Sequence, residues 1–196
     1  RRVLFRSAMI TLVKCELWLA QGRIDLAEAW LLRLSQTYSG NQPAIAPECH
    51  PQLPQHIELQ RAALERVQGL LPESEQRLRS LAQQAQDDGA QALYTAALIQ
   101  HILLLLGTSR EPEARALFIR SLQASSGGAL LPFHWLLRDY PQWLRAQLQH
   151  AAPSVSRDKL LALLPCATIS FRAPCEPLHG SEQLSARELS VLQLIA

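Results

Sequence analysis

Residues 8–34 read AMITLVKCELWLAQGRIDLAEAWLLRL and are rich in leucine and alanine. It contains two apolar segments separated by Gly22. In both segments apolar side chains recur every three or four positions, which is the spacing of the buried stripe of an amphipathic helix. The stripe consists of Leu12, Cys15, Leu19, Ile24, Ala27, Trp30, Leu31 and Leu34. The stretch therefore predicts two helices that fold back on each other as a hairpin.

The same pattern recurs twice along the chain. Residues 56–85 break at Gly69, and residues 90–122 break at residues 107–108. The breaking glycines lie 47 and 38 residues apart, which is longer than a strict tetratricopeptide repeat but within the range of stacked helical hairpins. Residues 41–55, NQPAIAPECHPQLPQ, account for the longer interval. Their prolines, at positions 43, 47, 51 and 54, predict an extended loop without helix.

One hairpin cannot bury its apolar face alone, so the three copies are predicted to stack on one another. The predicted fold class is all-α, because Ala, Leu, Gln, Glu and Arg dominate while β-branched residues are scarce. We expect a right-handed tetratricopeptide-like solenoid over residues 8–165. A compact irregular helical bundle is the alternative.

Residues 129–151, ALLPFHWLLRDYPQWLRAQLQHA, follow the third hairpin and concentrate aromatic side chains. Pro132 marks a helix start and Pro141 a break. The aromatic residues could form a ligand platform, but at helical spacing they favour the closing part of a core: Phe133, Trp135, Tyr140 and Trp143. A last short helix is predicted over residues 156–164, and the proline-containing residues 166–183 are predicted to be a linker.

Charge and composition exclude several classes of function. Residues 1–7, RRVLFRS, match one translated frame of a common sequencing adapter, so they are interpreted as a cloning scar; a basic helix start is the alternative. Without these residues 16 basic side chains stand against 17 acidic ones, so the formal net charge falls from +2 to −1. The net charge of the chain then no longer indicates nucleic-acid binding. No apolar run is long enough to cross a bilayer.

The residue types of metal and catalytic sites are scattered. The four cysteines form no CxxC pair, so Cys49 and His50 near His56 are a weak metal signal, and reduced thiols in a cytoplasmic protein are expected. His101 and His134 are isolated, and we interpret them as packed or surface groups rather than catalytic bases. No enzyme is predicted.

The last thirteen residues, 184–196, read LSARELSVLQLIA. Ser185 and Glu188 have the spacing of a capping box, and Leu184 with Leu189 fits a hydrophobic staple. Leu189, Leu192 and Ile195 continue an apolar stripe. This pattern predicts a well-defined helix start after the linker, and hence the beginning of a new folded unit.

This motif is similar to the opening of LuxR-type helix-turn-helix domains, L-[ST]-x-R-E-x-x-V-L-x-L-[IL]-A. Upstream, LAQGRIDLAEAWLLRL and VQGLLPESEQRLRSL resemble the sensor repeats of the MalT-like, large ATP-binding branch of that family. LLPFHWLLRDYPQWLRAQL resembles the stretch that closes those repeats. The resemblance covers nearly all of residues 8–196.

The resemblance implies which parts of such a regulator the sequence contains. In the family a later helix reads the bases, so residues 184–196 correspond to the first helix of a truncated domain. The upstream ATPase is not expected here, since no GxxxxGK[ST] loop occurs; the chain is expected to hold no cofactor, and ATP is expected for the full-length family member. Arg187 is the one residue left open for a phosphate contact. The residues that carry over are domain scaffold: Leu184, Ser185, Glu188, Leu189, Val191, Leu192 and Ile195.

The resulting hypothesis is a fragment of a cytoplasmic DNA-binding transcription regulator of the MalT-like LuxR type. The resemblance implies an inducer or regulatory protein on the helical repeats, DNA as a partner of the full-length protein only, and a homo-oligomer of that protein, with no membrane partner. The alternative is a tetratricopeptide-like interaction scaffold in which the last helix is another repeat. The 18-residue linker argues against this alternative, because stacked repeats seldom contain so long a gap.

Overall fold

The computed structural model describes residues 2–38, 52–125 and 130–164, and every regular element in these ranges is helical. The predicted all-α class is thereby confirmed for this part of the chain. These ranges belong to one compact unit that ends at Leu164. None of their helices has the length and apolar character needed to cross a membrane.

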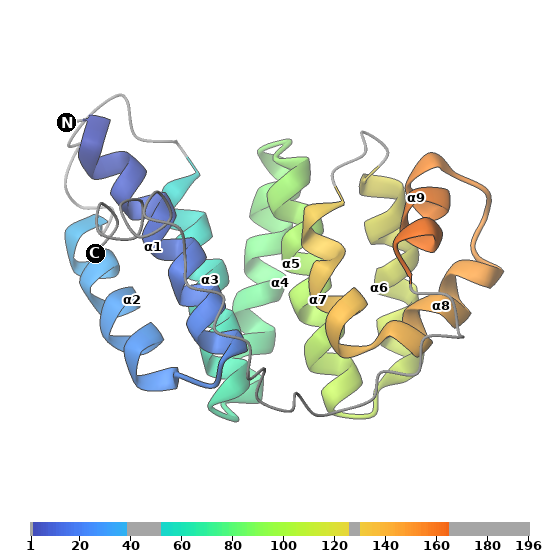
Figure 1. Ribbon diagram of the computed structural model, residues 1–196, viewed down its shortest axis with the longest axis horizontal. Coiled ribbons are helices and arrows are strands. Elements are labelled where there is room, and N and C mark those ends of the chain that lie inside the picture. Colours follow the sequence, from blue (N-terminus) through green and yellow to red (C-terminus); the bar gives the residue numbers. More distant parts are fainter. Residues whose placement is uncertain (1, 39–51, 126–129, 165–196) are drawn as a thin grey trace, which may run out of the picture. The chain divides into compact units, whose positions relative to one another are not determined.

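Six helices of 14 to 19 residues form the larger part of this unit (Figure 1). They pair into hairpins in chain order: α1 (Arg2–Ala20) with α2 (Ile24–Tyr38), α3 (Leu53–Val67) with α4 (Leu71–Asp87), and α5 (Gln91–Gly107) with α6 (Glu111–Ala124). The three predicted hairpins are confirmed as pairs of consecutive helices.

Four short turns join these helices with the same backbone geometry. In each turn one residue has a positive φ: Gly22 (73°), Gly69 (83°), Gly89 (68°) and Ser109 (60°). The N–H of the following residue donates to the carbonyl five positions earlier, as in Arg23 to Trp18 at 2.8 Å and Arg110 to Leu105 at 2.9 Å. This is the Schellman ending of a helix, which satisfies carbonyls that the helix leaves unpaired. Glycine adopts it without steric cost.

Each helix packs against the next, and the first helices of the hairpins also pack on one another, α1 on α3 and α3 on α5. Small residues lie fully buried where the helices approach: Ala27, Ala62, Ala97 and Ala114. The hydroxyl of Ser74 on α4 donates to the carbonyl of Ala62 on α3 at 2.8 Å. The helices are therefore held by a repeated pattern of neighbour contacts.

A closing segment, residues 130–164, packs against α5 and α6 at one end of this stack (Figure 1). It contains η1 (Leu131–Phe133), α7 (His134–Asp139), α8 (Pro141–His150) and α9 (Val155–Leu163). Phe118 of α6 meets Phe133 edge-on, with ring centroids 6.3 Å apart, and Trp143 at 5.5 Å. Phe133 and Trp135 are buried, while Tyr140 and Trp143 pack against the same core. The interpretation of the aromatic residues as core is confirmed.

The prediction that the prolines of residues 41–55 forbid helix is wrong at Pro54. Helix α3 begins at Leu53, before the expected start at His56, and Pro54 lies in its first turn. Proline is tolerated there because the first N–H groups of a helix have no partner within the helix. Pro72, Pro112 and Pro141 begin α4, α6 and α8 in the same way. The other prolines of that stretch lie outside the described residues.

Three further details differ from the sequence-based expectations. Trp30 was assigned to the buried stripe, but it is 37% exposed and stacks on Trp18 with centroids 6.3 Å apart. The break expected at residues 107–108 is confirmed, because α5 ends at Gly107, but the left-handed residue of that turn is Ser109. Helix α1 begins at Arg2 and so includes residues 2–7, which the sequence led us to interpret as a cloning scar outside the fold.

Candidate functional site

The first helices of the hairpins and α7 form one row, α1–α3–α5–α7, in which each helix packs on the next. We call the surface of this row the inner face. Every hairpin contributes a helix to this surface, so it is the candidate site for recognition. The polar side chains described below come from α1, α3, α5 and α7.

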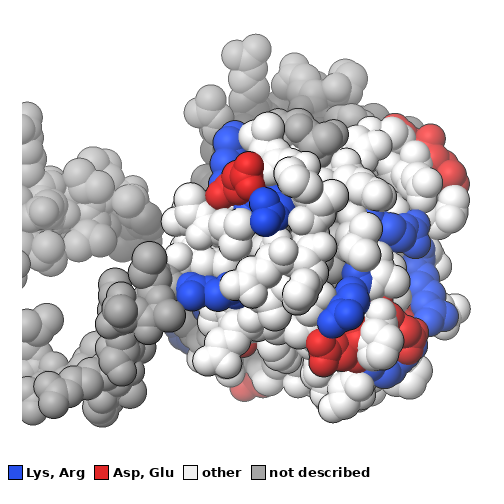
Figure 2. All heavy atoms as spheres, turned by 90° about the vertical axis from the view of Figure 1, so that its right-hand side faces the viewer, with Lys and Arg blue, Asp and Glu red and all other residues white. Residues whose placement is uncertain are grey.

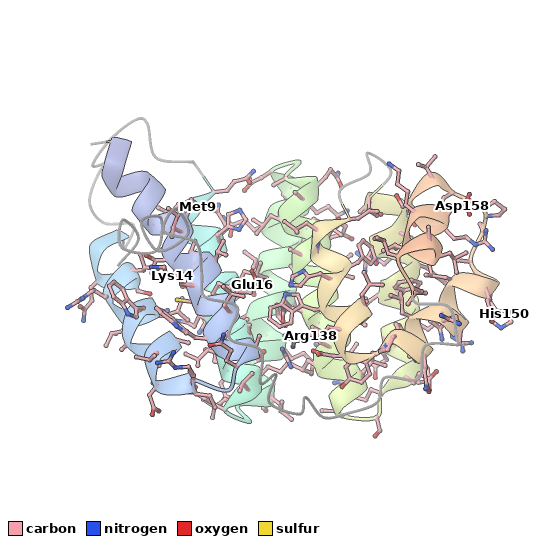
Figure 3. All side chains as sticks on the ribbon, in the orientation of Figure 1. Met9, Lys14, Glu16, Arg138, His150 and Asp158 are labelled. Carbon is pink, nitrogen blue, oxygen red and sulfur yellow. The ribbon has the colours of Figure 1, made fainter. Side chains whose placement is uncertain are left out.

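Glu16 on α1 reaches Trp135 on α7, which lies 119 positions further along the chain. The indole Nε1–H of Trp135 donates to a carboxylate oxygen of Glu16 at 2.8 Å, and Nε2 of His134 lies 3.8 Å from the same oxygen. The guanidinium of Arg138 lies over the Trp135 ring, 4.3 Å from its centroid. Figure 3 shows Glu16 and Arg138 near the middle of the molecule. The first and last helices of the inner face are therefore linked directly.

Arg66 on α3 adds a half-buried charge near α7. Burial lowers the pKa of its guanidinium, and the carboxylate of Asp139 partly offsets this effect. Its Nε atom is sealed from solvent without a hydrogen-bond partner among the described residues. Three glutamine oxygens on the inner-row helices are in the same situation: Gln55, Gln60 and Gln100. A buried polar atom without a hydrogen-bond partner lowers the stability of the fold. The helices of the inner face therefore carry polar atoms that could still form a hydrogen bond.

A second charged cluster ties α4, α5 and α6 together. Glu75 accepts from Arg110 at 2.8 Å and lies 3.4 Å from Nε2 of His101, while Arg110 also donates to Glu113 at 2.6 and 2.7 Å. The hydrogen bond from Arg110 holds the pKa of Glu75 below its usual value, and burial lowers the pKa of His101. His101 is thus buried, whereas the side chain of His134 is 43% exposed.

The remaining candidate residues give no site in the described part of the chain. Cys15 is buried, and burial raises the pKa of its thiol to about 11, so it is not a nucleophile at neutral pH. No group of three His, Cys, Asp or Glu side chains within residues 2–38, 52–125 and 130–164 is arranged to hold a metal ion. Cys49 and His50 lie outside the described residues.

The residues predicted as DNA-binding scaffold also lie outside the described residues, and so do Arg187 and the linker at 166–183. The structure instead brings Glu16 to Trp135 and places Arg66 near Asp139. The sequence pattern had included Trp135 among the aromatic residues and Arg66 in the stripe of the second hairpin, but not Glu16. The periodic pattern could not identify the contact between Glu16 and Trp135, because it locates buried stripes and not pairs that are distant in sequence. No protein-family model, curated protein or solved structure matches the chain.

Proposed function

We propose that this chain contributes the sensor region of a DNA-binding transcription regulator of the MalT-like LuxR type. The observation that carries the sensor assignment is the row α1–α3–α5–α7, in which successive hairpins present their first helices on one surface. Stacked helical hairpins form extended surfaces of this kind, and such surfaces bind ligands or partner proteins. Residues 8–165 are then a tetratricopeptide-like solenoid.

The DNA-binding part of the proposal is supported by the resemblance of residues 184–196 to the first helix of LuxR-type domains. An effector or regulatory protein engages the inner face, next to the Glu16–Trp135 contact. Because this contact links α1 to α7, an effector that separates the two helices changes the geometry of the whole row. The full-length protein, with ATP on its upstream domain, then forms the oligomer that binds promoters.

The test is chromatin immunoprecipitation of the gene product, tagged at its own chromosomal locus. We expect enrichment of a small set of promoters, and loss of that enrichment when the codons for residues 184–196 are deleted. Equal protein levels of the deleted and intact products serve as the control. The absence of enriched sites for the intact product under all growth conditions tested would overturn the proposal.

A tetratricopeptide-like interaction scaffold is the second candidate. The same inner face favours it, since the row α1–α3–α5–α7 supports partner binding without any DNA-binding part. A scaffold predicts a partner protein that co-purifies with the chain and is lost on substitution of Glu16 or Arg138. It predicts no enrichment of promoter DNA, so the immunoprecipitation experiment separates the two functions.

A further inference from the structure

A cavity of about 290 Å³ lies away from the Glu16–Trp135 contact, between α6 and the end of α8 with the residues that follow it. Figure 2 faces this end of the molecule and shows wide uncharged surface between small groups of charged side chains. The residues that decide its chemistry are Arg115, Phe118, Ile119, Leu122, Gln147 and His150. A space of this size corresponds to about ten water molecules, so it suits a small ligand.

Apolar side chains of α6 form one wall of the cavity. Phe118 and Leu122 are buried and belong to the core, while Ile119 is 49% exposed at the edge. A ligand that covered Ile119 and filled the space above Leu122 would remove apolar surface from water. The gain from burying an alkyl chain is about 0.8 kcal/mol for each methylene group.

Gln147 supplies an unused polar group in the cavity. The residue is only 6% exposed, and its amide makes no hydrogen bond to any of the residues that the structure describes. The amide is nevertheless not among the polar atoms that are sealed from solvent. The accessible part of Gln147 therefore includes its amide, which can bond to a group inside the cavity. Ligand sites are built in this way, from apolar walls and a few polar groups.

The ionisable side chains at the cavity are an arginine and a histidine. Arg115 comes from α6. His150 comes from the end of α8, where Figure 3 labels it, and no carboxylate is among the lining residues. The carboxylate nearest to Arg115 is that of Glu111, at 4.0 Å, and both side chains of this pair are more than half exposed. Such a pair is weak, so Arg115 is available to an anion.

We propose that this cavity binds a small amphipathic carboxylate, whose apolar body packs on Phe118, Ile119 and Leu122. The carboxylate pairs with the Arg115 guanidinium, and the Gln147 amide donates a further hydrogen bond to the ligand. A ligand with a cationic head is disfavoured by Arg115. The inference does not depend on the proposed function, because it rests on a surface that the inner face does not include.

The test is a titration of the full chain with octanoate, octanol and octylammonium, followed by isothermal calorimetry. We expect octanoate to bind with a Kd of about 0.1–1 mM, as is typical of a small ligand with few polar contacts. Octanol should bind about fivefold more weakly, since it lacks the ion pair. Octylammonium should not bind measurably. Equal binding of all three compounds, or no binding of octanoate, would overturn the proposal.

Variants at the cavity separate its contacts. Arg115→Gln should weaken octanoate about fivefold and leave octanol unchanged, while Gln147→Leu should weaken octanoate about threefold to tenfold. Ile119→Glu, at an exposed edge, should abolish binding without unfolding the protein, which circular dichroism can verify. Arg79→Gln is the matched control, because Arg79 pairs with Glu75 four positions earlier, as Arg115 does with Glu111. Unaltered octanoate affinity in Ile119→Glu would show that the ligand binds elsewhere, contrary to the proposal.

Discussion

Four of the described connections in α1–α6, those after α1, α3, α4 and α5, are turns of one kind. The short helices of the closing segment instead follow one another through Tyr140 or through residues 151–154. The contacts differ in the same sense. Buried leucine and alanine side chains recur along α1–α6 and form two clusters, so many residues share the stabilising contacts. The closing segment instead forms one core with Phe118, whose ring contacts those of Phe133 and Trp143. A repeated arrangement should tolerate single changes better than one that depends on a few rings.

Phe118→Ala should therefore lower the free energy of unfolding more than any of the other substitutions described below. The residue is 1% exposed, and its ring contacts both Phe133 and Trp143. Removing a buried phenylalanine ring costs about 3–5 kcal/mol of unfolding free energy. The loss can be measured by urea denaturation. Hydrogen exchange should increase first in α8 and α9, and least in α1 and α2.

The neighbouring Ile119→Ala is the control for this prediction. Ile119 lies on the same helix but is half exposed, so its truncation should cost about 0.5 kcal/mol. If the two variants lost equal stability, or if exchange increased uniformly over all helices, the closing segment would not depend on Phe118 in the way the ring contacts indicate.

The contact between the two regions should contribute less. Trp135→Phe removes the Nε1–H that donates to Glu16 and part of a buried ring, so we expect a loss of about 1.5 kcal/mol. Glu16→Gln keeps an oxygen that can accept the bond and should lose less than half as much. The free energies of both single variants and of the double variant give the coupling between the two side chains. Additive effects would mean that the contact does not stabilise the fold.

The sequence predicted the hairpins well, because helical periodicity is a local property of the chain. Apolar side chains three or four positions apart indicate a buried stripe wherever they occur, as at Leu12, Cys15 and Leu19. The expected breaks at Gly22 and Gly69 are also confirmed, since glycine can take the left-handed conformation that ends a helix. Helix starts were less accurate, because Pro54 is compatible with a first turn and was interpreted as a loop residue.

The candidate site could not be predicted in the same way. Glu16 and Trp135 are far apart in sequence, and no local pattern links them. Serine has no strong preference for the left-handed region, so Ser109 gave no signal of its turn. The DNA-binding interpretation of residues 184–196 depends on a resemblance to a family, and it stays a prediction.

The turns of α1–α6 permit a finer test of the comparison. Gly69→Ala places a Cβ at a φ of 83°, where nothing lies within 4 Å of it, so its cost is conformational rather than steric. A left-handed residue costs about 1–2 kcal/mol for alanine, partly offset by the lower entropy of the unfolded chain. We expect a net loss of about 1 kcal/mol in thermal or urea denaturation. A loss as large as that of Phe118→Ala would show that the hairpins also depend on single residues.

Ser109→Gly should have the smallest effect and the opposite sign. Ser109 adopts a φ of 60° in the turn between α5 and α6, where the other three turns have glycine. Glycine relieves the left-handed strain, but it increases the entropy of the unfolded chain, so the expected gain is about 0.5 kcal/mol. Ser109→Ala is the matched control, because it keeps a Cβ at the same φ and should bring no gain. If Ser109→Gly destabilised the protein instead, the fourth turn would differ from the others in more than its residue type. The uniformity of the turns would then be limited to the three that contain glycine.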